Sequence, residues 1–257
     1  MRGDRFADSD VVGCYRHRPP YCADVYDFLL ARTPHRARAL DLGCGPGKIA
    51  RMLALYFAHV DAVDPSGAML DEAVSQSGDP PSNVQWQQAT GEAASLTGPY
   101  DLVTAGASIH WMAPDIVFPR LAACVAPDGH VALIDGDDVF RPPWQAEWQG
   151  FLERWLGNVG QQWCSPDHVA RTRAYAPWFD VVEERRFVAP FVQGVPELIE
   201  CQHSRSTWAR SAMGDAMAAR FDDELRQLLL PYARGGVLSF DVETRVLWGR
   251  ARAHPRG

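Results

Sequence analysis

An alternation of short apolar runs and amphipathic segments organises the first half of the chain and limits the folds open to it. Residues 38–43, 59–64, 83–88, 100–106 and 130–135 have the character of strands, and segments with helical spacing of apolar residues separate most of them. Strands that alternate with helices predict a mostly parallel sheet with helices on both faces. We therefore expect a doubly wound α/β fold.

From residue 136 onward this alternation ends. Helical patterns over 144–155, 195–213 and 221–233 surround two further strands, predicted over 179–188 and 243–251. The connection between the fifth and sixth strands exceeds 40 residues, which is longer than a usual crossover. We predict a single domain over 1–257 whose segments 136–175 and 195–213 form a helical lid on the substrate side.

Composition narrows the possible partners. The chain has 257 residues and a formal net charge of −7, which argues against nucleic acid or an anionic membrane surface as a partner. No apolar run is long enough to span a membrane, and the N-terminus lacks the apolar core of a signal peptide. The six cysteines include no C-x-x-C pair, so we expect no zinc site or disulfide framework and predict a cytoplasmic protein.

The segment DLGCGPGK, residues 41–48, places three glycines behind the first predicted strand. A P-loop would need glycine at Leu42 and a hydroxyl at Ile49, and neither is present. The glycines follow the pattern G-x-G-x-G, which differs from the dinucleotide fingerprint G-x-G-x-x-G. The turn is therefore not predicted to bind a nucleotide pyrophosphate.

Two carboxylates accompany the glycine turn. Gly43, Gly45 and Gly47 allow a ligand to approach the backbone closely, because no Cβ is in the way. Asp64 ends the second strand, where an acidic side chain can accept both ribose hydroxyls, and Asp41 ends the first strand within reach of an ammonium group. This combination suits a nucleoside that carries an amino acid.

The stretches ALDLGCGPGKIA, VDAVDPSGAML, QATGEAASLTGPYDLVTAGASIHW and PDGHVALID occur in this order. Together they resemble the class I S-adenosylmethionine-dependent methyltransferases, and within them the small-molecule branch related to trans-aconitate methyltransferase. The resemblance covers roughly residues 13–135 closely. It implies a Rossmann-like sheet of seven strands with the last one antiparallel, S-adenosylmethionine as cofactor, and methyl transfer to a small molecule. We expect oxygen as the acceptor atom, with nitrogen and carbon as the alternatives.

The resemblance also implies roles for individual residues. Asp41 would hold the methionine ammonium, the backbone of Gly43, Cys44 and Gly45 would run beside the methionine part, and Asp64 would accept the ribose hydroxyls. The other implied cofactor contacts are Tyr15, Arg18, Pro65, Ser66, Met69, Thr90, Gly91, Glu92, Ser108 and Ile109. Many relatives carry an acid where this chain has Thr90.

His110 is the candidate catalytic residue. A histidine suits the removal of a proton from an acceptor at neutral pH. The alternative is that His110 and Trp111 are structural, with Trp111 in the packing and His110 hydrogen-bonded to the lid. The sequence supports both interpretations equally.

The candidate substrate contacts are Trp111, Trp144, His203, Arg205 and Trp208. Trp144 belongs to a group with Trp148, Trp155 and Trp163 that could line an apolar pocket, although aromatic residues at helical spacing more often pack a core. A lone histidine on a helix, such as His203, is by default a surface residue.

Three further motifs are given structural interpretations. Asp135, Asp137 and Asp138 could hold Mg²⁺, but no acid follows the fourth strand to complete a site, so we expect a solvated turn or a helix cap and no metal. The stretch RPPY at 18–21 lacks the asparagine and the preceding strand of the nucleic-acid motif NPPY. Cys44 is interpreted as a small filler of the turn and not as a nucleophile.

Two alternatives to methyl transfer remain open. The fold could bind S-adenosylmethionine and run a cyclisation or rearrangement, or it could be a non-catalytic partner of another enzyme. The intact glycines and Asp64 count against the second alternative. The sequence gives no indication of the oligomeric state.

Overall fold

The computed structural model describes residues 9–75, 80–158 and 174–256. The five strands of the first half are β1 (Arg38–Leu42), β2 (His59–Asp64), β3 (Val84–Gln88), β4 (Tyr100–Gly106) and β5 (Val125–Asp135), and they pair in parallel in the order β3-β2-β1-β4-β5. Buried parallel strands have nearly continuous apolar sequences, and the runs 38–42 and 100–106 follow this rule.

The last strand, β8 (Val237–Ala251), is antiparallel to β5, as predicted. The short β6 (Val139–Phe140) continues along the same edge of β8, and the long β7 (Phe179–Gly194) pairs with the other edge. The sheet therefore has eight strands, one more than expected, because the two-residue β6 is too short to show a sequence pattern.

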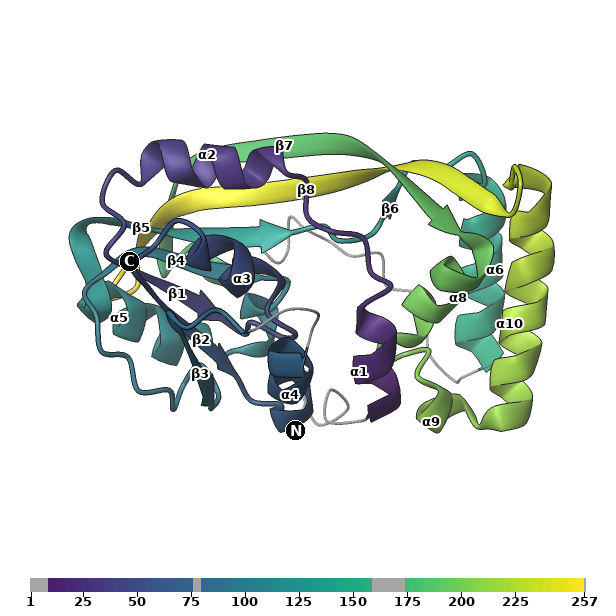
Figure 1. The fold of residues 1–257 in the computed structure, drawn as a ribbon, viewed down its shortest axis with the longest axis horizontal. Helices are drawn as coiled ribbons and strands as arrows, with labels where there is room; N and C mark the ends of the chain where they lie inside the picture. The colour runs from purple at the N-terminus through teal and green to yellow at the C-terminus, as the bar shows by residue number, and fades with distance from the viewer. Residues whose placement is uncertain (1–8, 76–79, 159–173, 257) are drawn as a thin grey trace.

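Helices cover both faces of the sheet (Figure 1). The helices α2 (Asp24–Arg32), α3 (Lys48–Ala54) and α4 (Gly67–Ser75) share one apolar core with the sheet, and α5 (Pro114–Cys124) packs on the other face. Alternate residues of β1 divide between the two cores, since Ala39 joins the first and Leu40 and Leu42 join the second. The doubly wound architecture is confirmed.

A second group of helices lies beyond the end of the sheet, where the long strands β7 and β8 reach it (Figure 1). It contains α6 (Gln145–Asn158), α8 (Val195–His203), α9 (Arg210–Met213) and α10 (Asp215–Leu229), while α1 (Ser9–Tyr15) contacts α8 and α9 from the sheet side. We call this group the lid. Its core is separate from those of the sheet and is built around Trp144, Phe151, Trp155 and Phe221.

The lid differs in detail from the expected segments. The helix expected over 195–213 is interrupted at Ser204–Ala209 and becomes α8 and α9, and α10 joins the same core although it lies outside the predicted lid boundaries. Two short 3₁₀ helices, η2 (Ile109–Trp111) and η3 (Leu230–Tyr232), complete the described elements. Trp163, expected in the aromatic group, lies outside the described residues. In the described part of the chain, no helix has the length and apolarity needed to cross a membrane.

Candidate cofactor and acceptor site

The glycine turn joins β1 to α3, and its backbone has a conformation that residues with a side chain rarely adopt. Gly43, Gly45 and Gly47 have φ angles of +71°, +52° and +79°. A Cβ on Gly43 would lie 2.4 Å from the Cβ of Ser108, and one on Gly47 would lie 2.6 Å from the ring of Trp86. A Cβ on Gly45 would meet nothing within 4 Å. Packing therefore requires two of the glycines, and the third leaves bare backbone facing open space.

Asp64 ends β2 beside this turn and is 8% exposed. Its carboxylate accepts the backbone N–H of Gly45 at 2.8 Å and that of Ser66 at 2.9 Å. Burial raises the pKa of Asp64, and these two N–H donors oppose the rise. The carboxylate thus links the turn to the start of α4, where the Ser66 hydroxyl accepts the N–H of the buried Met69 at 3.2 Å.

Asp41 is more deeply buried, with 1% of its surface exposed. Its carboxylate accepts the N–H of Ala50 at 3.0 Å and the hydroxyl of Thr104 at 2.9 Å. Burial raises the pKa of Asp41 to about 7, against the opposing effect of these two hydrogen bonds. Asp41 therefore changes charge near neutral pH.

The loop after β3 holds three of the predicted cofactor contacts. Glu92 accepts the N–H of Ala113 at 2.8 Å, while Arg120 donates to the carbonyl of Gly91 at 2.8 Å. A Cβ on Gly91 would lie 2.7 Å from the Met112 sulfur, so the Met112 side chain packs directly against this glycine. Thr90 and Pro65 are exposed at the same edge of the sheet.

The carboxyl end of β4 carries the candidate catalytic histidine. Ala107 has a φ of +49°, which is uncommon outside glycine and marks a strained turn. The Ser108 hydroxyl then donates to the carbonyl of Leu42 at 2.6 Å, which ties this turn to the glycine turn. His110 is half-buried, with its ring centroid 4.9 Å from that of Trp111, whose side chain is largely exposed.

The segment from Tyr15 to Cys22, here called the entry segment, joins α1 to α2 beside the glycine turn. Arg18 donates to the hydroxyl and carbonyl of Ser204 at 2.8 and 3.0 Å and to the hydroxyl of Tyr15 at 3.1 Å. Its guanidinium also pairs with Asp137 at 3.4 Å. The two predicted residues, Tyr15 and Arg18, are therefore brought together at the carboxyl end of the sheet.

Lys48 holds the entry segment from the other side. Its Nζ donates to the carbonyls of Arg18 and Pro19, each at 3.1 Å, and burial lowers its pKa. The sequence predicts no role for Lys48, because its surroundings do not match a P-loop. Its position directly after the glycine turn was the available signal.

A cavity of about 30 Å³ lies between the entry segment and the glycine turn. It is lined by Tyr15, Tyr21, Asp41, Gly43, Cys44, Gly45, Pro46, Lys48, Ile49, Gly106 and Asp137. Ligand pockets usually measure about 300–1,000 Å³. The entry segment therefore covers much of the glycine turn in this structure.

The predicted substrate residues of the lid are mostly buried. Trp144 and His203 are each 1% exposed and Trp208 is 4% exposed. The His203 ring contacts the carbonyl of Trp208 and the Asp222 carboxylate, both at 2.6 Å, so the default of a surface histidine is wrong. Trp144, His203 and Trp208 lie within the lid and line neither of the two described cavities, and their role as substrate contacts stays a prediction.

Asp137 and Asp138 both lie in ion pairs, and of the two only Asp138 is exposed to solvent as expected. Asp137 is 7% exposed and pairs with Arg18, and Asp138 pairs with Arg205 at 2.8 Å. Burial alone raises the pKa of Asp137, but the charges of Arg18, Lys48 and Arg205 outweigh it and lower that pKa. Two carboxylates at the end of β5 thus bind the entry segment and the lid.

Comparison of this chain with known proteins finds similarity to methyltransferases. A family model described as a methyltransferase domain matches residues 39–129. A trans-aconitate 2-methyltransferase of Paracidovorax citrulli is 30% identical over 180 residues, which are 66% of this chain and 58% of that protein. The chain thus spans little more than half the length of this curated relative.

Two solved structures share the fold over nearly the whole chain. A structure from Anaeromyxobacter dehalogenans assigned as a type II methyltransferase has a TM-score of 0.67 and 22% identity, covering 93% of this chain and 99% of that chain. An S-adenosylmethionine-dependent methyltransferase from Thiobacillus denitrificans, in complex with S-adenosylhomocysteine, has a TM-score of 0.51 and 15% identity, covering 98% and 99%.

Residues 39–129 therefore match a methyltransferase domain, and the chain shares the fold of solved methyltransferases over nearly its whole length. The cofactor that these comparisons support is S-adenosylmethionine, which the Thiobacillus denitrificans structure names. The residues present suit it, because the bare backbone at Gly45 lies beside the carboxylate of Asp64.

The two glycines of the turn provide a stability test. Gly47→Ala introduces a steric clash with Trp86 in addition to backbone strain at positive φ. Gly45→Ala introduces only the backbone strain, which costs about 1–3 kcal/mol. We expect Gly47→Ala to lower the free energy of unfolding by clearly more than Gly45→Ala, as measured by urea denaturation. Equal losses would contradict the packing role of Gly47.

Proposed function

We propose that this protein transfers a methyl group from S-adenosylmethionine to an oxygen atom of a small-molecule acceptor. The observation that supports this most directly is the bare, positive-φ backbone of Gly45 hydrogen-bonded to the Asp64 carboxylate at the carboxyl edge of a class I sheet. Relatives named trans-aconitate 2-methyltransferase favour oxygen, because the nucleophilic atoms of a carboxylic acid are its oxygens.

For the cofactor we propose the residues around the glycine turn. Asp64 accepts the ribose hydroxyls, Asp41 faces the methionine ammonium, and the backbone of Gly43, Cys44 and Gly45 runs along the methionine part. The adenine side is assigned to Pro65, Ser66, Met69, Thr90, Gly91 and Glu92. Tyr15 and Arg18 cover the cofactor from the entry segment. When bound, S-adenosylmethionine supplies an electrophilic methyl group on a sulfonium.

For the acceptor we propose a position between the end of β4 and the lid, with Ser108 and Ile109 beside the reacting atoms. His110 removes the proton of a hydroxyl acceptor, since an imidazole accepts protons at neutral pH. Trp111 offers an exposed aromatic surface next to it, and we assign Arg205, which pairs with Asp138 after β5, to the lid side of the acceptor. Correct positioning of the acceptor atom against the methyl group supplies most of the remaining rate enhancement.

Formation of S-adenosylhomocysteine, measured with a panel of small carboxylic acids, phenols and amines, tests the function. With an acceptor that must lose a proton, we expect His110→Gln to lower kcat about 10²–10⁴-fold and to remove the acidic limb of its pH profile. His130→Gln, on β5 against Trp248, is the control. Turnover of an acceptor without S-adenosylhomocysteine would indicate non-methyl chemistry, and an unchanged pH profile would reduce His110 to a structural residue.

Asp64→Asn is expected to weaken binding of S-adenosylhomocysteine at least 10-fold, because a neutral amide accepts the ribose hydroxyls less strongly than a carboxylate does. Calorimetric titration measures the affinity, with NAD as the control ligand. The matched variant is Asp71→Asn, an exposed carboxylate on α4. Equal affinities of the two variants would remove Asp64 from the cofactor site.

Binding of S-adenosylhomocysteine should strengthen as the pH rises from about 5.5 to 7.5. The pKa of Asp41 is raised to about 7, and a ligand ammonium favours the ionised carboxylate, so binding releases a proton below that pKa. Calorimetry in two buffers of different ionisation enthalpy detects this release. Thr104→Val removes a hydrogen bond that lowers this pKa and should shift the transition to higher pH. Affinity independent of pH would contradict the role of Asp41.

A further inference from the structure

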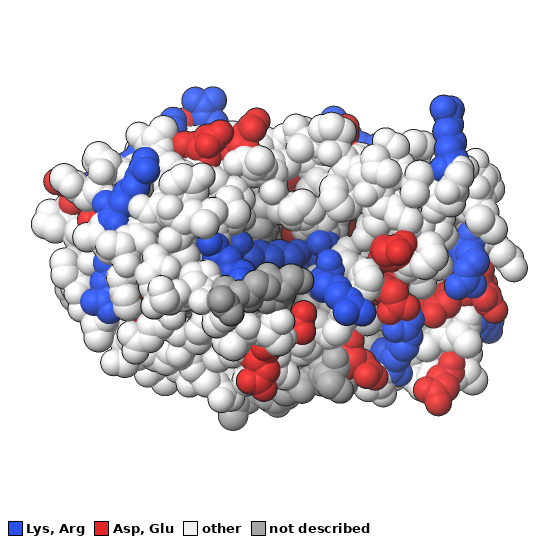
Figure 2. Space-filling view, in the orientation of Figure 1, with Lys and Arg blue, Asp and Glu red and all other residues white. Residues whose placement is uncertain are grey.

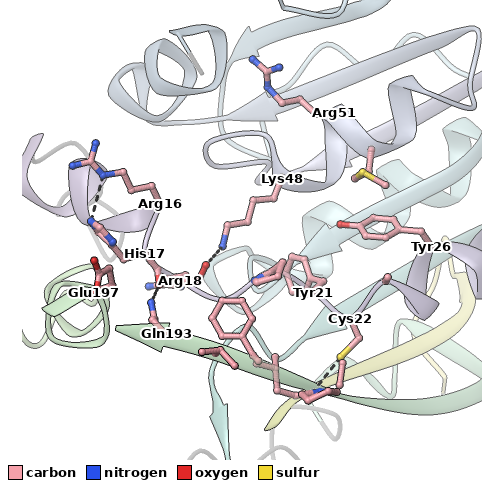
Figure 3. A pocket seen from close by; sticks show the side chains of 18 of the residues that line it. Arg16, His17, Arg18, Tyr21, Cys22, Tyr26, Lys48, Arg51, Gln193 and Glu197 are labelled. Carbon is pink, nitrogen blue, oxygen red and sulfur yellow. Dashed lines mark hydrogen bonds between the residues drawn. The ribbon is translucent and has the colours of Figure 1, made fainter. Parts of the chain in front are cut away.

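A second, larger cavity lies against the entry segment and measures about 860 Å³ (Figure 3). The entry segment, α3 and the last residues of β7 line it. Only Tyr21 and Lys48 line both this cavity and the small one at the glycine turn. The entry segment therefore separates two cavities, and only the smaller one contains the glycines and Asp41.

Much of the wall of the larger cavity is apolar. Tyr21, Tyr26, Met52, Phe191 and Val242 contribute apolar surface, together with prolines at positions 20 and 190. Its volume falls within the range of about 300–1,000 Å³ that is usual for small-molecule sites. The cavity can therefore bury an aromatic or branched aliphatic group.

Basic side chains surround this apolar wall. Arg16, Arg18, Lys48 and Arg51 line the cavity, and among the described residues Glu197 is the one acidic side chain that lines it. Within the described residues, Arg16, Lys48 and Arg51 have no carboxylate at ion-pair distance. The chain as a whole carries a net charge of −7, so the excess of positive charge around the cavity is opposite in sign to the net charge of the protein. Figure 2 shows Lys and Arg side chains gathered at the middle of the face, between the sheet and the lid.

Two acceptors lie at the end of the cavity nearest Arg16 and His17 (Figure 3). Gln193 is 8% exposed, and its amide nitrogen donates to the carbonyl of His17 at 2.6 Å. Its side-chain oxygen has no hydrogen-bond partner in the described structure, which is costly for a buried acceptor. Glu197 is exposed and has no cation at ion-pair distance among the described residues.

We propose that this cavity is a second ligand site that binds a free α-amino acid with an apolar side chain. The ligand carboxylate pairs with Arg16, and its ammonium donates to Glu197 and to the unpartnered oxygen of Gln193. Its side chain packs against Tyr21, Tyr26 and Phe191. A simple organic anion would leave both acceptors unsatisfied, and an amine would leave the basic residues unpaired. The site does not depend on methyl transfer, because its residues are complete without the cofactor.

Calorimetric titration of the full chain with L-phenylalanine tests the proposal. We expect one-to-one binding, at least 10-fold tighter than that of 3-phenylpropanoate, which lacks the ammonium, or phenethylamine, which lacks the carboxylate. Saturating S-adenosylhomocysteine should leave one phenylalanine bound per chain. The absence of binding at millimolar concentrations, or competition with S-adenosylhomocysteine, would overturn the assignment of a separate site.

Arg16 and Glu197 are exposed and carry opposite charges, so they can be substituted as a matched pair without disturbing an apolar core. Arg16→Gln should weaken phenylalanine and 3-phenylpropanoate about equally, at least 5-fold, and should strengthen phenethylamine, because repulsion of the ligand ammonium is lost. Glu197→Gln should weaken phenylalanine and phenethylamine but strengthen 3-phenylpropanoate, because the remaining repulsion of the ligand carboxylate is lost. Phenylalanine binding that is unchanged in both variants would place the ligand elsewhere on the protein and contradict the proposal.

Discussion

The arrangement of the site depends on the hydrogen bonds and the ion pair that the buried guanidinium of Arg18 makes. A charge taken out of water is tolerated only when hydrogen bonds and an opposite charge replace its hydration. Arg18 finds these partners in three separate parts of the chain, at Tyr15, at Asp137 after β5 and at Ser204 after α8. The entry segment, the edge of the sheet and the lid are therefore brought to one point.

The carboxylates around this point differ in environment and, through it, in charge. Asp137 faces three basic side chains, and its pKa is lowered despite deep burial. Asp41 accepts an N–H and a hydroxyl, and burial, together with the nearby charge of Asp64, raises its pKa to about 7. Asp64 accepts two backbone N–H groups, and burial raises its pKa. The same type of side chain is thus held as an anion at Asp137 and is made less acidic by burial at Asp41 and Asp64.

The entry segment has two faces with different chemistry. Toward the glycine turn it presents Tyr15, and toward the larger cavity it presents Arg16 and His17. Lys48 holds the backbone between them through two carbonyls, and Tyr21 borders both cavities. The entry segment therefore forms a wall that the two cavities share.

The sequence by itself determined a mostly parallel, doubly wound sheet and the place of the glycine turn. These follow from local patterns, because alternation of strands and helices and the spacing of Gly43, Gly45 and Gly47 are properties of neighbouring residues. The antiparallel final strand was implied by the family resemblance, and the order of the strands in the sheet was decided by the tertiary structure. Only the tertiary structure decided what His203, Lys48 and Asp137 do. Each is satisfied by partners distant in the sequence, in Asp222, the backbone of Arg18 and the side chain of Arg18, and no local period records such pairs. The larger cavity was likewise decided by the tertiary structure alone, because segments at 16–26, 48–52 and 189–194 meet only in the folded chain.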